Sequence, residues 1–440
     1  MMWLQYLVSA LLSLIALTTA TVPVIVKWNN TKSYGPDGPW QVVTVELGQN
    51  AAGDAVDTID LLPGGIWESI VNTPLICNGS SASACPAARA GLYNTKDSHN
   101  AIRNFTNKPV LVYQWSSQAA LNISAKATSV LDVMSINTLG GVVTVGNSTL
   151  AAVDTSQIML PDGTKYSTQV GSLSLGAPNS GLQPFGTDIS NPVLGDINGQ
   201  TFPGALAARN DTPSNSFGLH CGSASLNQAG SLVWGGYDQS RVLGDIGSFD
   251  LSSGNAMQVS LFDIQIGVEK GTSPFTSDSL TGLLKLNASF NGVQPVLINP
   301  VVPYFFMSPD TCAAIARNLP VTLQPNIGLY TWNTADPQFQ NILKSPSYLA
   351  FIFQNSGAGN LTIKVPFQLL NLTLEAPIVS QTQQYFPCRP FQASDGTGAY
   401  FFGRAFLQAA FLGMNWEQRK WFLAQAPVSA TLSLYGDNGG

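Results

Sequence analysis

The chain carries the same short pattern twice, once in each half. Residues 59–67 read IDLLPGGIW, and residues 297–305 read LINPVVPYF. Each copy is an apolar strand end, then one polar residue (Asp60 or Asn299), then a short turn and bulky apolar residues. Each is followed later in its half by a short run ending in glycine, SLG at 174–176 and FFG at 401–403. The repeat predicts two related lobes that face each other, each placing one polar side chain at their junction.

Length and composition suit this arrangement. The 440 residues are enough for two packed lobes of about 200 residues each. Only 10% of the residues are charged and 41 are glycine, which is typical of a turn-rich, secreted β protein. A net charge of −6 argues against a nucleic-acid partner, because no basic cluster is present to neutralise phosphates.

The first twenty residues resemble a secretory signal. An apolar run from Leu7 to Leu17 ends in the small residues at 18–20, although no Lys or Arg precedes it. An uncleaved membrane anchor is the alternative, but the run is short for a bilayer span. We therefore predict a signal peptide at 1–20, a mature chain without a transmembrane span, and a short tail at 427–440.

Nine Asn-x-Ser/Thr sequons support export. One sequon means little, but nine beside a signal peptide predict a secreted, extracellular glycoprotein, with association to a cell wall left open. We expect a monomer. The predicted glycosylation sites are Asn29, Asn78, Asn104, Asn122, Asn147, Asn210, Asn287, Asn360 and Asn371.

The five cysteines fit an exported chain. Cys77 and Cys85 lie close in sequence and are expected to close a short loop, and Cys312 with Cys388 is expected to tie the second half. Cys221 is then left over. It lies in an apolar stretch, so we predict a buried and unreactive thiol.

Most of the chain reads as β structure. Residues 40–48 alternate in hydrophobicity like a strand, and a second strand runs into Asp60. Further strand-like runs are expected at 142–145, 232–234, 259–262, 350–353 and 361–363. The best helix candidate is 310–319, with Ser308 or Asp310 as its N-cap. Residues 21–38 read as a polar lead-in, and 177–215 as a long surface loop.

The chain resembles the pepsin-like aspartic peptidases, and among them divergent secreted or surface proteins of filamentous fungi. The resemblance covers about residues 38–426 and rests on GLYN at 91–94, GGYD at 235–238 and YFFGRAFLQ at 400–408, with AQA at 424–426. It implies a mainly β, bilobal fold with two pseudo-symmetric lobes around a central cleft. The predicted lobes are residues 21–240 and 241–426.

In that family each lobe supplies an Asp followed by Thr or Ser and Gly. Two carboxylates held together share one proton, so one activates a water while the other polarises the scissile carbonyl. Alignment on Trp67 assigns Asp60 to the first catalytic position, with an alternative at Asp57. In the second lobe the position is occupied by Asn299, whose amide has no proton to exchange.

Other family features are altered. The residues after Asp60 are both leucine, and those after Asn299 are Pro and Val, so the supporting hydroxyls and close backbone approaches are lost. No flap tyrosine can be assigned, since Tyr113 is too far from the nearest matching strand. Only Lys27 and Lys32 are basic between residue 20 and the first core strand, so a basic inhibitory prosegment is missing.

These departures favour a non-catalytic homologue that binds a peptide or protein ligand in its cleft. The alternative is an aspartic-type endopeptidase with residual or altered activity through Asp60. A structural wall or adhesion protein with a vestigial cleft is not distinguished from the first hypothesis. Asp60 and Asn299 also have purely structural interpretations, as an acceptor for the following turn and as a bond across the lobe junction.

Other chemistries are disfavoured. The chain has only two histidines, His99 and His220, in unrelated contexts, which argues against a Ser-His-Asp triad or a zinc site. The glycines at 64–65 lack the following Gly-Lys of a phosphate-binding loop. We therefore expect no cofactor and no metal.

Overall fold

The structure is a computed structural model of the chain. It describes residues 21–78, 85–103, 121–178, 182–185, 197–252, 255–286, 292–355, 359–392 and 400–428. The predicted signal peptide, the sequons at Asn104 and Asn287, Tyr113 and residues 429–440 of the tail lie outside the described residues.

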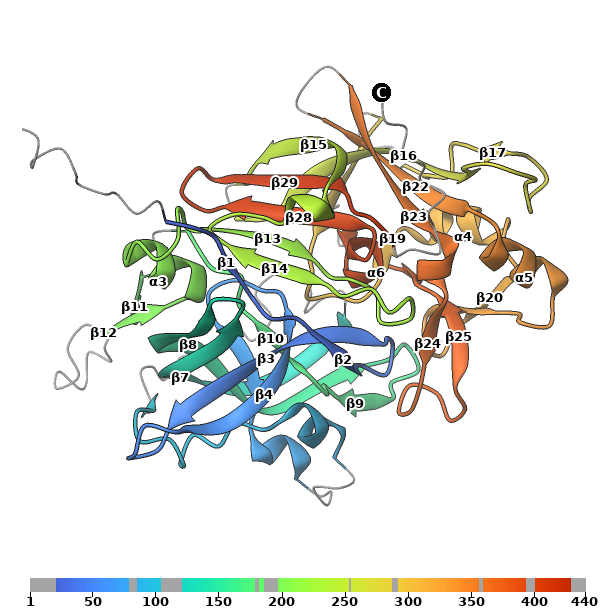
Figure 1. The fold of residues 1–440 in the computed structure, drawn as a ribbon. Coiled ribbons are helices and arrows are strands. Elements are labelled where there is room, and N and C mark those ends of the chain that lie inside the picture. The colour runs from blue at the N-terminus through green and yellow to red at the C-terminus, as the bar shows by residue number, and fades with distance from the viewer. Residues whose placement is uncertain are drawn as a thin grey trace, which may run out of the picture.

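The chain folds into two β lobes joined by a central sheet, as predicted (Figure 1). The first lobe is built on an eleven-stranded sheet. Its main path, in spatial order, is β11 (Leu182–Phe185), β12 (Ile197–Gln200), β8 (Gly141–Met159), β5 (Ser69–Asn72), β10 (Gly171–Leu173), β4 (Ala55–Pro63), β3 (Trp40–Gln49), β7 (Ile123–Thr138) and β6 (Ile102–Arg103), with β2 (Asn29–Tyr34) on β3 and β9 (Lys165–Ser167) on β8.

The second lobe contains an eight-stranded and a four-stranded sheet. The larger sheet runs β23 (Asn360–Pro366), β22 (Ser347–Gln354), β16 (Gln258–Val268), β18 (Gln294–Ile298), β27 (Tyr400–Phe402), β19 (Phe305–Met307) and β26 (Cys388–Pro390), with β17 (Ser279–Leu280) on β16. The smaller sheet runs β20 (Val321–Gln324), β21 (Leu329–Trp332), β25 (Gln383–Phe386) and β24 (Leu372–Leu374).

A six-stranded sheet connects the lobes and takes strands from both halves of the chain. Its order is β1 (Val24–Ile25), β14 (Ser231–Trp234), β13 (Ser216–His220), β28 (Ala410–Asn415), β29 (Lys420–Gln425) and β15 (Leu243–Asp250). Because β13 pairs with β28, the two halves share one continuous hydrogen-bonded layer. The proposed lobe boundary at residue 240 therefore falls within this shared layer, between β14 and β15.

Helices are few and short in the described chain. They are α3 (Phe202–Ala208), α4 (Pro309–Ala316), α5 (Pro337–Lys344) and α6 (Arg404–Leu407), with 3-10 turns at Pro74–Cys77, Pro86–Ala90, Gln239–Arg241 and Phe367–Leu370. The helix predicted over 310–319 is α4, which ends earlier, at Ala316. Of its two predicted caps Ser308 is the one found, since its hydroxyl accepts a hydrogen bond from the Thr311 amide.

The second lobe has an aromatic core. Phe351 lies 4.8 Å from Phe402 between ring centroids, and Phe406 packs 5.4 Å from the same ring. All three side chains are fully buried, which stabilises the fold by about 1.5–3 kcal/mol for each ring. The sequence of β22 is nearly continuously apolar rather than alternating. The strand lies between β16 and β23 in the sheet, and successive side chains are buried on both of its faces.

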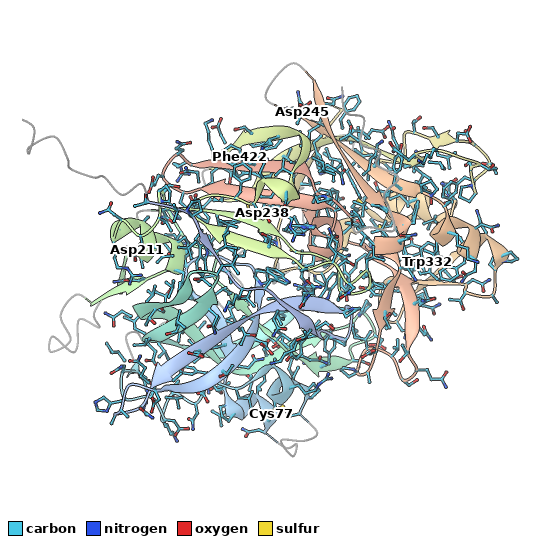
Figure 2. All side chains as sticks on the ribbon, in the orientation of Figure 1. Cys77, Asp211, Asp238, Asp245, Trp332 and Phe422 are labelled. Carbon is cyan, nitrogen blue, oxygen red and sulfur yellow. A yellow bond between two sulfur atoms is a disulfide. The ribbon has the colours of Figure 1, made fainter. Side chains whose placement is uncertain are left out.

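Both predicted disulfides are confirmed, Cys77–Cys85 and Cys312–Cys388. Cys77 lies at the periphery of the first lobe (Figure 2). Cys221 is free and buried, as expected, and burial raises the pKa of its thiol to about 12. At neutral pH this thiol stays protonated and therefore a poor nucleophile.

The N-terminal segment, predicted as a polar lead-in, forms strands in two sheets. Val24 pairs with Trp234 in the central sheet, while β2 pairs with β3 in the first lobe. The predicted surface loop at 177–215 is also partly wrong, because it includes β11, β12 and the buried helix α3.

The described sequons differ in exposure. Asn78, Asn122, Asn210 and Asn360 are exposed, while Asn29, Asn147 and Asn371 are half-buried. The Asn29 amide also donates a hydrogen bond to the Thr44 hydroxyl at 3.0 Å. Glycosylation remains a prediction at every one of these positions.

A buried histidine in the central sheet makes the fold sensitive to acid. His220 is 1% exposed, and its Nε2 donates to the Gln408 carbonyl at 2.9 Å. Burial lowers the pKa of His220 from 6.5 to about 4. The unfolded chain therefore binds a proton at a higher pH than the folded chain, so stability is lost as the pH falls below 6.5.

We predict that acidification from about pH 7.5 to about pH 4.5 removes on the order of 2 kcal/mol of unfolding free energy through His220 alone. His220→Gln should flatten this part of the profile, measured by urea unfolding. His99→Gln, at an exposed site, is the matched control. An unchanged decline in His220→Gln would contradict the assignment.

Candidate functional site at the lobe junction

Two loops with the same hydrogen-bonding pattern meet at the junction. In the first lobe β10 runs parallel to β4, and the Gly64 amide donates to the Leu173 carbonyl at 2.9 Å. In the second lobe β27 runs parallel to β18, and the backbone N–H of Asn299 donates to the Phe402 carbonyl, also at 2.9 Å. The two lobes therefore present equivalent turns.

The strand register identifies the equivalent residues. Pro63 lies opposite Leu173, and Ile298 lies opposite Phe402. In each lobe the residue after this pair on the first strand donates the backbone hydrogen bond described above. Gly64 is therefore the first-lobe counterpart of Asn299. The assignment of Asp60 to this position is wrong, because Asp60 lies four residues earlier, in the middle of β4, opposite Thr44.

The same register corrects the paired sequence runs. The first-lobe counterpart of residues 401–403 is 172–174, not 174–176, since Leu173 lies opposite Pro63 where Phe402 lies opposite Ile298. Alignment on Trp67 was misleading, because the first-lobe turn is built differently: Trp67 itself has a left-handed backbone, with φ 70°.

The two turns lie in contact. A Cβ atom placed on Gly64 would lie 3.2 Å from both the amide nitrogen and a side-chain carbon of Val301. Any side chain at residue 64 would therefore push against the backbone of the opposite lobe. Gly64, the first-lobe counterpart of Asn299, thus contributes no side chain to the junction.

Asn299 is buried and bonded within its own turn. It is 4% exposed, and its Oδ1 accepts a hydrogen bond from the Val301 amide at 3.0 Å. Its Nδ2 has no hydrogen-bond partner among the described residues. Asn299 thus holds its own loop and makes no described side-chain bond to the first lobe, which differs from the predicted structural interpretation.

Asp60 is the acceptor of a separate cluster. Its carboxylate, 2% exposed, accepts hydrogen bonds from the Thr44 hydroxyl at 2.6 Å, the Tyr34 hydroxyl at 2.6 Å and Lys32 Nζ at 2.8 Å. Burial, and then the carboxylate itself, raise the pKa of Tyr34, so it remains a donor. These contacts fit a structural role, with partners on β2 and β3 rather than in the turn.

The alternative first-lobe carboxylate, Asp57, also lies away from the junction. It stands opposite Leu47 on β3, and one oxygen accepts a hydrogen bond from the Asn94 amide at 2.9 Å. Burial raises its pKa. Asp57 therefore anchors the GLYN segment to β4.

Residues 35–39 cross from the first lobe to the second. The Pro36 carbonyl accepts from the Glu375 amide at 2.8 Å, and the Gly38 carbonyl accepts from the Thr373 amide at 3.0 Å. The Tyr385 hydroxyl donates to the Asp37 carbonyl at 2.5 Å. This crossing segment therefore extends the exposed edge of β24.

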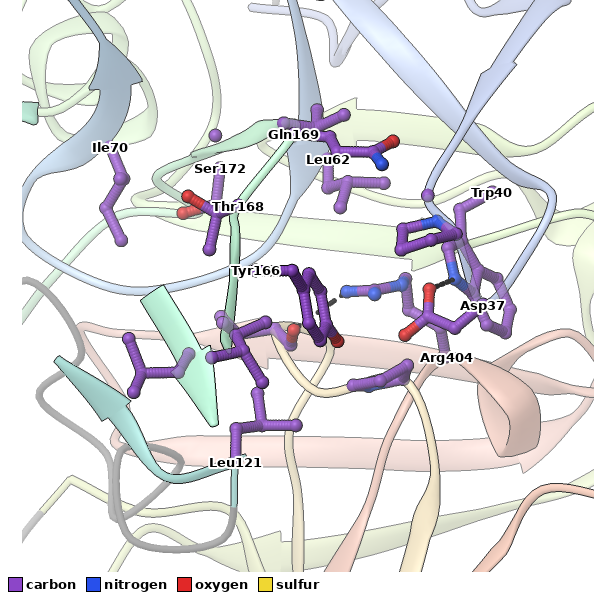
Figure 3. Close-up of a pocket in the computed structure, with 18 residues that line it drawn as sticks. Asp37, Trp40, Leu62, Ile70, Leu121, Tyr166, Thr168, Gln169, Ser172 and Arg404 are labelled. Atoms are coloured by element: carbon purple, nitrogen blue, oxygen red, sulfur yellow. Dashed lines mark hydrogen bonds between the residues drawn. The ribbon is translucent and has the colours of Figure 1, made fainter. Parts of the chain in front are cut away.

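Two hollows flank the crossing segment. A groove of about 470 Å³ lies between the first lobe, at Pro86 and Arg89, and the second lobe, at Thr373 and Glu375. A smaller cavity of about 80 Å³ reaches the junction itself, where Leu62 and Val301 line it (Figure 3). We call these the groove and the junction cavity.

No metal centre is evident in the described part of the chain. It holds no group of three or more His, Cys, Asp or Glu residues that could bind a metal ion. Among the same residues, no helix is long and apolar enough to cross a membrane.

Comparison with known proteins gives the fold. No protein-family model and no curated protein sequence matches the chain. Among solved structures, the chain is similar to the aspartic proteinase from Irpex lacteus, with a TM-score of 0.54 and 14% identity. The match covers 90% of this chain and 96% of that one. At this identity the similarity shows that the chain has a bilobal, pepsin-like fold. It does not indicate an activity.

The Asp60 cluster yields a stability prediction. Asp60→Ala removes a buried carboxylate that accepts three hydrogen bonds, so we expect a loss of about 2–4 kcal/mol in unfolding free energy. The matched control is Asp245→Ala at the exposed end of β15 (Figure 2), which should change stability by less than about 0.5 kcal/mol. Urea unfolding of both variants measures this, and equal effects would contradict the structural role.

Proposed function

We propose that the chain is a secreted, extracellular glycoprotein with a pepsin-like fold that binds a peptide or protein segment between its lobes without cleaving it. The observation that carries this proposal is the pair formed by Gly64 and Asn299. Neither residue provides a carboxylate, so this pair cannot share the proton on which catalysis by aspartic peptidases depends.

The alternative, residual cleavage through Asp60, receives no support from the contacts of Asp60. Its carboxylate is already occupied by three donors within the first lobe. A general base must reach the attacking water directly, and Asp60 does not line the junction cavity.

The groove supports ligand binding. Both lobes line it, and so does the crossing segment through Gly35, Pro36 and residues 38–39. Arg89 and Glu375 place opposite charges on opposite walls, both exposed. An extended segment could thus be oriented by its own charges. We propose that the binding form is a monomer, free or wall-associated, with no nucleic-acid partner.

The first test is cleavage of an unfolded protein by the purified secreted chain, from about pH 2.5 to about pH 6, with and without a statine-type inhibitor. Circular dichroism at each pH confirms folding, and an active fungal aspartic proteinase is the positive control. We expect no inhibitor-sensitive cleavage. Such cleavage would overturn the non-catalytic assignment.

A variant sharpens the test. Asn299→Asp should fold, because the replaced Nδ2 makes no described hydrogen bond, but it should not gain strong cleavage while Gly64 faces it. Activity within about tenfold of the positive control would show that one carboxylate suffices.

Binding is tested with short peptides selected from a random phage-displayed library and measured by fluorescence anisotropy. Glu375→Arg should weaken binding of groove ligands about tenfold or more. Asp245→Arg, a matched charge reversal outside the groove, should leave binding unchanged. Equal effects would move the binding site away from the groove.

A further inference from the structure

The junction cavity holds several polar groups that lack protein partners. Ser172, 5% exposed, has a hydroxyl with no hydrogen-bond partner among the described residues. Arg404, 7% exposed, has an Nε that is likewise unpartnered. Both residues line the cavity. Buried polar atoms normally find partners, so these donors indicate a missing acceptor.

The charge of Arg404 is only partly compensated. Its Nη1 donates to the carbonyls of Pro300 at 3.2 Å and Val301 at 2.8 Å, and its guanidinium lies 4.9 Å from the Trp40 ring. No carboxylate forms an ion pair with it among the described residues. The Nε edge is thus left for another acceptor.

An acceptor faces the same cavity. Asp37 lines it and uses one oxygen to accept from Trp40 Nε1 at 2.9 Å, while its other oxygen accepts no hydrogen bond from a described residue. Tyr166 also lines the cavity, and its hydroxyl has no described partner. In Figure 3, Asp37, Trp40 and Arg404 gather on one side, away from Ile70 and Leu121.

The remaining walls are apolar. They include Leu62, Ile70, Ile123 and Ile158. The volume of about 80 Å³ equals the share of about two or three waters, or a group of about five non-hydrogen atoms. The cavity therefore suits a small group with a polar head and a short apolar stem.

We propose that the junction cavity binds a carboxamide. An amide oxygen can accept from Arg404, Tyr166 or Ser172. Its NH₂ can donate to Asp37, so one neutral head satisfies both kinds of group. A carboxylate would leave a net negative charge in the cavity, and an ammonium or amidinium a net positive one, and both are costly when buried.

This proposal rests on the proposed function and deepens it. A Gln or Asn side chain of the bound peptide is the source that we assign, since the cavity and the groove share Gly35, Pro36 and Gln169. A free small amide has the same chemistry, and the experiment separates the two sources.

The first arm uses three probes of one shape: propionamide, propionate and propionamidine. Methyl NMR spectra report on Ile70, Ile123 and Ile158, with Ile342 of α5 as an internal control outside the cavity. We expect saturable shifts at the cavity isoleucines, on the order of millimolar affinity, for propionamide, and about tenfold weaker binding of both charged probes. No shifts, or equal shifts for all three, would overturn the proposal.

Variants check the polar head. Tyr166→Phe and Ser172→Ala should each weaken propionamide binding about threefold or more. Tyr304→Phe is the matched control, since Tyr304 is fully buried but does not line the cavity. Equal effects of the two tyrosine variants would contradict the assigned contacts.

The second arm uses library-selected peptides that carry Gln, Glu or Leu at one position. About tenfold preference for Gln, lost in Tyr166→Phe, supports a side chain as the source. Propionamide binding without any Gln preference would assign the cavity to a free amide instead. Failure of all peptides with intact propionamide binding would overturn the proposed function and the peptide source, and would leave the carboxamide site itself standing.

Discussion

The contact between the Gly64 turn and the Asn299 turn is the constraint on which the rest of the structure depends. The turns meet at backbone distance because Gly64 has no side chain, and a Cβ there would lie 3.2 Å from the Val301 amide. The turns can approach this closely only while residue 64 places no side chain between them. In an aspartic peptidase the same place must hold two carboxylates and a water. Close packing and that chemistry compete for one space, and here packing occupies it.

Much of the fold could be predicted from the sequence. The strand at Trp40, the helix capped by Ser308 and both disulfides depend on local pattern and spacing, and each is found where it was expected. The pairing between strands that are distant in the sequence could be predicted only in part. The repeat indicated two equivalent turns, but it could not give the register of β4 against β10, and one polar residue near each turn was insufficient to set it.

The candidate site shows the same limit more sharply. Asp60 is a carboxylate before a Pro-Gly turn, yet two of its partners, Lys32 and Tyr34, come from β2, a strand that no motif indicates. The sequence gives no sign that Gly64 is special, because a glycine in a turn is common and its lack of a side chain marks no site. Arg404 was visible in the closing run of the resemblance. Only the tertiary structure shows that its guanidinium reaches Trp40 and the junction cavity.

The N-terminal segment has a consequence for the order of folding. Within some twenty residues it pairs with Trp234 in the central sheet, with β3 in the first lobe and with Glu375 in the second. The ribosome makes this segment before all of these partners, and two of them, Trp234 and Glu375, emerge far later. Such long-range pairing is slow, because long stretches of chain must be closed before any contact forms. Because its last partner lies in the second lobe, the docking of this segment is expected to be the final step of folding. Until then its unpaired strand edges could pair with other chains.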